Sequence, residues 1–177
     1  MSIIATDLDG TIFKGQTLID GVKEGLLKII NEGIEIYYTT NNSSQTPSEI
    51  KDKLENLLQF DINISKIITP LVIFQNLYSD DKLNIFIYGS ENLKKYIKNL
   101  NMNVTSLENA ELVLIGRKEE NNFSEINEII KSVSIGKNIL SLNKDLTFPT
   151  EVGEKAGNGA VVKIIEDELS ISIPTLG

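Results

Sequence analysis

Two aspartates near the start of the chain stand two positions apart at the end of an apolar segment. They are Asp7 and Asp9 in the stretch IIATDLDGTIFKG, residues 3–15, where the apolar residues give way to Gly10 and Thr11. Two neighbouring carboxylates repel each other unless one is protonated or a cation lies between them. Mg²⁺ typically takes one or two protein carboxylates together with the oxygens of a phosphate substrate. The pair therefore predicts a Mg²⁺ site with room for a phosphate ester.

The same segment has two simpler interpretations. It fits a surface turn in which Asp9 caps the backbone and Gly10 adopts a positive φ angle, and taken alone it does not separate that turn from a catalytic site. It also resembles the start of a calcium-binding loop. Such a loop needs Gly at its sixth position and Glu at its twelfth, where this chain has Ile12 and Leu18. The spacing excludes the calcium loop.

A second apolar segment, IEIYYTTNNSS, ends in hydroxyl and amide side chains. If residues 34–40 form a strand parallel to a buried strand over residues 2–7, Thr40 and Asn41 reach the same sheet edge as Asp7. Ligands bind at this carboxyl edge in open α/β sheets, and a hydroxyl with successive backbone N–H groups there forms a cradle for an anion. We interpret the three polar residues that follow as a connecting loop: Asn42, Ser43 and Ser44.

Short apolar segments alternate with helical patterns along most of the chain, which predicts βαβ units around a parallel sheet. The fold class is therefore α/β, with a Rossmann-like core. The expected strands cover residues 2–7, 34–40, 64–69, 82–88, 111–115, 138–142 and 171–176. The expected helices cover residues 22–30, 70–78, 91–100, 123–133 and 160–169, and a further helix begins at Thr46, whose cap Pro47 and Glu49 support.

Composition excludes several classes of function. The net charge is −8 and no stretch concentrates Lys or Arg, so nucleic acid is not an expected partner. The chain contains no Cys and no His, which removes thiolate chemistry and the commonest general base. No apolar stretch reaches the length of a membrane span and no secretory signal begins the chain, so a cytoplasmic protein without a membrane partner is expected.

The two segments resemble the haloacid dehalogenase superfamily of aspartate-nucleophile phosphatases, through DLDGT at residues 7–11 and TNN at residues 40–42. Residues 7–47 look specifically like the branch that contains p-nitrophenylphosphatase, phosphoglycolate phosphatase and NagD-type enzymes. Three later stretches also match that branch: AELVLIG at 110–116, LNKDLTFPTE at 142–151 and AGNGAVVKII at 156–165. The resemblance covers the whole chain.

The resemblance implies a role for each residue that matches a motif. Asp7 is the expected nucleophile, which forms an aspartyl phosphate, and Asp9 the expected acid and base. The Asp7 carboxylate and the Asp9 main-chain carbonyl are the expected ligands of Mg²⁺, the implied cofactor. Thr40 and the amides near Asn41 and Gly10 are expected to hold the phosphoryl oxygens of a small phosphorylated metabolite.

The resemblance also implies a division of the chain. Residues 1–79 and 170–177 match the hydrolase core, and residues 80–169 match an inserted α/β cap that selects the substrate. Asn143, Asp145 and the glycines at 157–159 match cap positions, and we interpret the glycines as turn residues. The family continues beyond the stretch that ends at Gly177 with a catalytic lysine and an acidic metal ligand. The chain is therefore expected to be truncated and to turn over weakly or not at all.

Two alternatives to an active phosphatase stay open. One is a non-catalytic module for binding or oligomerisation. The other is a receiver-like domain that is phosphorylated on Asp7 without turnover. An uncovered sheet edge at the end of the chain predicts self-association into a homo-oligomer, because free strand edges pair readily.

Overall fold

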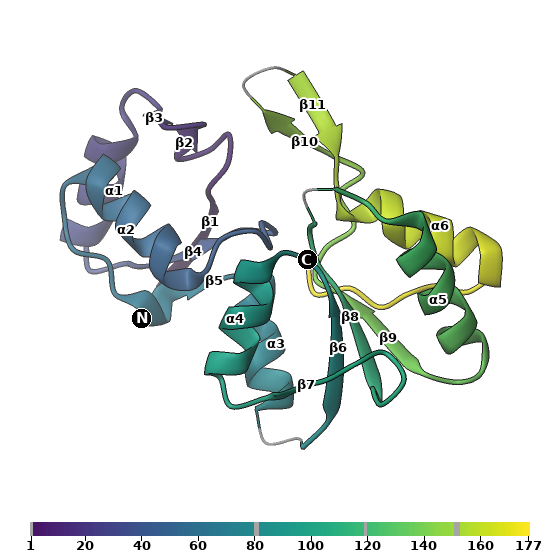
Figure 1. Ribbon diagram of the computed structural model, residues 1–177. Helices are drawn as coiled ribbons and strands as arrows, with labels where there is room; N and C mark the ends of the chain where they lie inside the picture. Colours follow the sequence, from purple (N-terminus) through teal and green to yellow (C-terminus); the bar gives the residue numbers. More distant parts are fainter. Residues whose placement is uncertain (1, 80–81, 119, 151–152) are drawn as a thin grey trace. The chain divides into compact units, whose positions relative to one another are not determined.

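The computed structural model describes residues 2–79, 82–118, 120–150 and 153–177. The chain divides into two compact units, Met1–Val72 and Ile73–Gly177, and each is built around its own parallel sheet (Figure 1). The α/β fold class is confirmed. The assignment of residues 1–79 plus 170–177 to a core and 80–169 to a cap stays a prediction, and its boundary at residue 80 lies outside the described residues.

The first unit contains a parallel sheet in the order β1-β4-β5. Its strands are β1 (Ile3–Asp7), β4 (Glu35–Thr39) and β5 (Ile67–Ile68). Its helices are α1 (Val22–Asn31) and α2 (Pro47–Leu58), with the short 3₁₀ helix η1 (Ile64–Lys66) before β5. A two-stranded hairpin that the sequence did not predict, β2 (Phe13–Lys14) and β3 (Thr17–Leu18), follows β1.

One face of this sheet carries the hydrophobic core of the unit. The strand β4 alternates in burial, so that Ile36 and Tyr38 point into the core. They pack in one cluster with Leu54 and Leu58 of α2. The helix α2 begins as expected at Thr46, whose side chain accepts from the N–H of Glu49 while the Glu49 carboxylate accepts from the N–H of Thr46 at 2.7 Å.

The expectation that the first strand is buried is wrong. Ile3 is 57% exposed and Ile4 is 37% exposed. The reason is the strand order, because β1 lies at the edge of the three-stranded sheet and only β4 pairs with it in the described residues. The core of the unit is filled instead from the residues just beyond β1: Leu8, Ile12 and Phe13 are all buried.

The second unit contains a parallel sheet in the order β7-β6-β8-β9. Its strands are β6 (Asn84–Tyr88), β7 (Asn103–Val104), β8 (Leu112–Ile115) and β9 (Asn138–Ser141). Its helices are α3 (Pro70–Tyr78), which begins within the first unit, α4 (Glu91–Asn99), α5 (Phe123–Ser134) and α6 (Asn158–Leu169). Figure 1 shows α3 and α4 on one face of the sheet and α5 and α6 on the other. An antiparallel hairpin, β10 (Thr147–Thr150) and β11 (Gly153–Ala156), precedes α6.

The predicted strand over residues 171–176 is absent. A single parallel bridge pairs Ser141 with Thr175, supported by a hydrogen bond from the N–H of Ser141 to the carbonyl of Pro174 at 2.9 Å. Proline has no N–H, so this segment cannot continue a regular ladder on that residue. The segment is fixed instead through Ile173, which is buried and whose N–H donates to Glu166 of α6 at 2.7 Å.

Gly157 and Gly159 are required by close packing. Gly157 is the N-cap of α6 and Gly159 lies in its first turn, which corrects their interpretation as turn residues. A Cβ atom at Gly157 would overlap the carbonyl oxygen of Asp145, and one at Gly159 would overlap that of Lys144. Glycine at the start of α6 therefore lets the loop after β9 lie directly against the helix.

This packing predicts opposite effects of the same substitution at two helical glycines. Gly159→Ala should lower the free energy of unfolding by about 1–3 kcal/mol, because the methyl group meets backbone that has no side-chain freedom. Gly25→Ala in α1 should raise it by about 0.5–1 kcal/mol, since nothing lies within 4 Å of the added atom. Urea denaturation of both variants checks the pair, and equal effects would contradict this packing.

Glu166 predicts a pH-dependent contribution to stability. Hydrogen bonds from the Lys144 ammonium and the Ile173 N–H, both at 2.7 Å, hold its pKa below the ordinary value of 4.5. A lowered folded pKa stabilises the fold above the unfolded pKa, and this contribution is lost as the pH falls through the folded pKa.

Glu166→Gln should therefore lower the Tm by about 2–4 °C at pH 7. Once the pH is low enough to protonate the wild-type carboxyl, the difference should vanish. Thermal unfolding followed by circular dichroism across this pH range measures the effect. The exposed Glu168→Gln on the same helix serves as the control, and a Tm difference that persists in acid would contradict the assignment.

Candidate active site

The pairing of β1 with β4 brings the two polar segments of the first unit together. The strands are parallel, with Asp7 opposite Thr39, and the Thr39 hydroxyl donates to the carbonyl of Thr6 at 3.1 Å. Thr40 and Asn41 follow directly, so they lie at the same carboxyl edge as Asp7. The expected juxtaposition is present, and the chemical roles of these residues stay predictions.

One residue, Leu8, separates the two aspartates and begins the turn that follows β1. The carbonyl of Leu8 accepts from the N–H groups of Thr11, Ile12 and Phe13 at 3.2, 2.9 and 3.2 Å. The Leu8 side chain is 1% exposed and lies in the core, whereas Asp7 and Asp9 on either side of it are exposed. Burial of Leu8 therefore fixes both carboxylates at the surface of the unit.

Gly10 provides the sharp turn that the sequence suggested. Its φ angle is +83°, a conformation that favours glycine, and its N–H donates to the carbonyl of Phe13 at 2.8 Å. This segment can therefore form a sharp turn at Gly10 and still carry a catalytic site at Asp7 and Asp9. Because the Gly10 N–H is already used within the turn, a contact from Gly10 to a phosphoryl oxygen stays a prediction.

Thr40 is held rigidly at the end of β4. It is 8% exposed, its N–H donates to the carbonyl of Ile68 at 3.1 Å, and its hydroxyl accepts from the N–H of Asn42 at 3.0 Å. Asn41 beside it is exposed. The loop interpretation of Asn42 is supported by its side chain, whose oxygen accepts from the N–H of Ser44 at 2.8 Å.

Ser43 has an unexpected environment in the same loop. It is 4% exposed, and its hydroxyl has no hydrogen-bond partner among the residues that the structure describes. A buried hydroxyl without a partner is costly unless water or a ligand satisfies it. The pattern of apolar and polar residues did not predict the burial of Ser43, because Ser43 lies in a loop without regular periodicity.

Asp9 has a perturbed carboxyl group. Partial burial is the main cause that raises its pKa, and the negative charge of Asp7 adds to the rise, while the positive charge of Lys53 opposes it. A carboxyl whose pKa is raised in this way holds a proton more readily than an ordinary aspartate. That property suits a general acid.

Lys53 is the residue near the candidate site that the sequence reasoning missed. It lies on α2, and its Nζ atom is 3.5 Å from the centre of the Phe13 ring. Burial lowers the pKa of Lys53 while the charge of Asp9 raises it. Helical periodicity could have predicted that Lys53 lies beside the core. Ile50, Lys53 and Leu54 share one face of α2, and Ile50 and Leu54 are buried in the core.

The donor set fits magnesium rather than a structural metal such as zinc. In the part of the chain that the structure describes, no three His, Cys, Asp or Glu side chains form a group able to hold a metal ion. Asp7 and Asp9 offer only oxygen ligands at an exposed edge. Mg²⁺ retains water and substrate oxygens in its shell, so two protein groups are sufficient to hold it.

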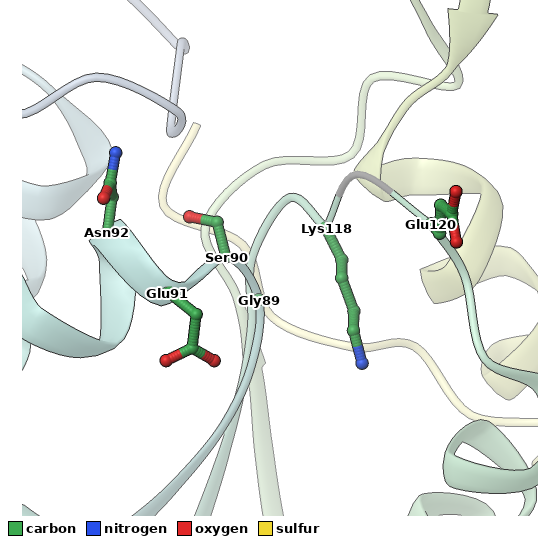
Figure 2. Close-up of a pocket in the computed structure, with 6 residues that line it drawn as sticks. All are labelled: Gly89, Ser90, Glu91, Asn92, Lys118 and Glu120. Carbon is green, nitrogen blue, oxygen red and sulfur yellow. The ribbon is translucent and has the colours of Figure 1, made fainter.

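The second unit has a cavity of about 380 Å³ at the carboxyl ends of β6 and β8. Six residues line it: Gly89, Ser90, Glu91, Asn92, Lys118 and Glu120 (Figure 2). In Figure 2 their side chains do not converge on one point, since Glu91 and Lys118 extend to one side and Asn92 to the other. Lys118 pairs with Glu125, and Glu91 pairs with Lys94 at 2.8 Å. These charges are satisfied within the unit.

The loop after β9 carries Asn143 and Asp145. Asn143 is 7% exposed, and its carbonyl accepts from the side-chain amide of Asn158 at 2.9 Å. Asp145 is exposed, although partial burial raises its pKa. Their contact with a substrate stays a prediction.

Comparison with known proteins identifies the family. The profile of the haloacid dehalogenase-like hydrolases matches residues 4–103, which include both polar segments. The chain belongs to the haloacid dehalogenase-like hydrolases. It is 30% identical over 161 residues to an acid sugar phosphatase of Staphylococcus haemolyticus, and the match covers 90% of this chain and 61% of the relative. The chain thus spans less than two thirds of the length of that phosphatase.

Solved structures of phosphatases share the fold. The p-nitrophenyl phosphatase of Archaeoglobus fulgidus is 20% identical with a TM-score of 0.88, and the match covers 98% of this chain and 67% of that one. A glycerol phosphate phosphatase of Mycobacterium tuberculosis, solved in complex with magnesium, is 23% identical with a TM-score of 0.83. That match covers 99% of this chain and 54% of that one.

Within residues 2–79, 82–118, 120–150 and 153–177, no helix has the length and apolar character needed to span a membrane.

The electrostatics of this haloacid dehalogenase-like site predict that one aspartate destabilises the fold. Asp7→Asn should raise the Tm by about 1–2 °C in low salt, because it removes a like charge beside the partly buried Asp9. The gain should shrink in 1 M NaCl, where the charges are screened.

Asp9→Asn is the matched comparison for this effect. It also removes the repulsion but loses the attraction to Lys53, so its gain should be smaller. Differential scanning calorimetry of the three proteins measures both effects, and a lower Tm for Asp7→Asn than for the wild type would contradict the assigned repulsion.

Proposed function

We propose that this chain provides the nucleophile side of a Mg²⁺-dependent phosphatase that hydrolyses small phosphorylated metabolites. The observation that carries the proposal is the register of β1 and β4, in which Asp7 stands opposite Thr39 and next to Thr40 at one sheet edge. The proposal is further supported by family membership and by the names of the relatives, which include acid sugar and glycerol phosphate phosphatases.

The first half of the proposed reaction transfers the phosphoryl group to Asp7. A carboxylate oxygen of Asp7 attacks phosphorus while the bond to the leaving oxygen breaks, and Asp9 donates its proton to that oxygen. Thr40 and the amides near Asn41 and Gly10 hold the phosphoryl oxygens as charge develops on them. The Asp7 carboxylate and the Asp9 carbonyl would hold Mg²⁺, which supplies positive charge against the phosphoryl group when bound.

The second half of the proposed reaction restores the enzyme. Asp9, now a carboxylate, takes a proton from water, and the water oxygen attacks the phosphorus of the aspartyl phosphate. The bond between phosphorus and the Asp7 oxygen breaks, which releases inorganic phosphate. The raised pKa of Asp9 supports this double role, because the group retains a proton more readily than an ordinary aspartate.

We also infer a two-domain organisation in which residues 80–169 form a substrate-selecting cap domain and residues 1–79 and 170–177 form the core. Separate packing of the sheet β7-β6-β8-β9 supports a distinct cap body. The low turnover, the cytoplasmic location and the homo-oligomer expected from the sequence stay predictions. Sedimentation velocity tests the last of these.

Loss of the nucleophile should abolish catalysis. Hydrolysis of p-nitrophenyl phosphate by the wild type should require Mg²⁺ and stop with EDTA, and Asp7→Asn should reduce it by about 10³-fold or more, as expected for an essential nucleophile. The exposed Asp61→Asn is the control and should retain full activity, because Asp61 lies in a pocket with the start of β4, at the opposite end of that strand from Thr39.

Mass spectrometry adds a second readout to this test. Intact mass after rapid quenching should show one added phosphoryl group in the wild type and none in Asp7→Asn. Full activity of Asp7→Asn would refute the nucleophile assignment. A stable adduct without turnover would favour the receiver-like alternative.

A further inference from the structure

Lys53 lies in a place where a positive charge is hard to hold. Its side chain is half-buried on the core-facing side of α2, with Nζ 3.5 Å from the centre of the Phe13 ring. Phe13 itself is 2% exposed, so the ring cannot move away from the ammonium. An aromatic face attracts a cation at this distance but does not by itself replace its lost hydration. A neighbouring negative group would stabilise the charge of Lys53.

Asp9 is the acidic residue that is joined to the backbone of Phe13. Asp9 and Phe13 form a parallel bridge, and the N–H of Gly10 donates to the carbonyl of Phe13 at 2.8 Å. The ring under Lys53 therefore belongs to the same rigid turn that presents Asp9. The mutual influence of the two charges on their pKa values agrees with this proximity.

Other charged groups near Lys53 are already used or point into solvent. Glu49 and Asp52 line the same surface cavity of α2 as Lys53, together with Gln16, Gln45, Asn56 and Leu57. The Glu49 carboxylate accepts from the N–H of Thr46 at 2.7 Å and from its hydroxyl at 2.9 Å. Asp52 is exposed. Asp9 is thus the acidic group whose position Lys53 can determine.

We propose that Lys53 is a positioning residue for Asp9. The ammonium, fixed between α2 and the Phe13 ring, holds the Asp9 carboxyl group away from Asp7 and in the orientation that reaches the leaving oxygen of the substrate. This inference rests on the proposed phosphatase function. Under this proposal two elements hold Asp9 in place: the turn that contains it and Lys53 of helix α2.

Loss of this positioning role can be distinguished from general loss of structure, because only the former depends on the leaving group of the substrate. An alkyl phosphate releases a strongly basic alkoxide, so its cleavage depends on proton donation by a correctly placed acid. p-Nitrophenolate is a stable anion and leaves with little need of a proton. Misplacement of Asp9 should therefore slow alkyl phosphates selectively, whereas a damaged fold would slow both substrates alike.

The first experiment compares glycerol phosphate with p-nitrophenyl phosphate. Lys53→Met, which keeps the apolar stem, should reduce kcat/KM for glycerol phosphate by about tenfold and kcat/KM for p-nitrophenyl phosphate by less than threefold. The ratio kcat/KM reports the step that releases the leaving group, whereas kcat also contains the hydrolysis of the aspartyl phosphate, which both substrates share. Lys53→Arg should restore most of the glycerol phosphate rate. Lys51→Met is the matched control, since Lys51 on the same helix pairs with Glu55 at 2.6 Å, and it should change neither rate.

Equal losses on the two substrates, or no loss on either, would overturn the positioning role. In the Asp9→Asn background, Lys53→Met should cause no further loss on glycerol phosphate. An additional tenfold loss there would show that Lys53 acts through some other group.

A second experiment does not depend on catalysis. The Tm values of the wild type, Lys53→Met, Asp9→Asn and the double variant form a cycle, in which the shift caused by Lys53→Met should be at least halved when Asp9 is already neutral. Additive shifts would overturn the inference even if both substrates are hydrolysed. If neither substrate is hydrolysed but the shifts are coupled, this chain lacks the proposed phosphatase activity while the electrostatic coupling between Lys53 and Asp9 stands.

Discussion

The parallel pairing of β1 with β4 is the constraint on which the candidate site depends. Parallel strands end at the same sheet edge, so one ladder carries Asp7 and Thr40 to one place although they lie far apart in sequence. A shift of one residue in this register would turn each side chain to the other face. The alternating burial of Ile36 and Tyr38 on β4 opposes such a shift, because only one register leaves both in the core.

A small number of core residues then determine the direction of the carboxylates. Leu8 is buried between Asp7 and Asp9, and its carbonyl closes the turn that follows. Two like charges held close together are unfavourable, and the fold accommodates them by placing a cation near one of them. The ring of Phe13 joins these two functions, since it fills the core from the same turn and supports Lys53 above it.

The second unit depends on close packing at the start of α6. The Asn158 amide donates to the carbonyls of Ile115 and Asn143 and to the Ser141 hydroxyl, which ties α6 to the ends of two strands. Gly159 permits the loop after β9 to lie on the helix. The loop that carries Asp145 is thereby held against α6 by close backbone contacts and amide hydrogen bonds, together with the ion pair between Lys144 and Glu166 at 2.7 Å.

Sequence alone determined the fold class, the order of the βαβ elements and the juxtaposition of two polar strand ends. These features follow from local signals, namely hydrophobic periodicity and helix caps such as Thr46. Sequence alone did not find Ser43, Lys53 or the close packing of Gly159. It also assigned a buried first strand and a final strand that the structure lacks. These features depend on strand order and on which surfaces meet, and residues distant in the chain decide both. Local sequence patterns show which side chains are apolar enough to be buried. Tertiary packing decides which of them are buried in the folded chain.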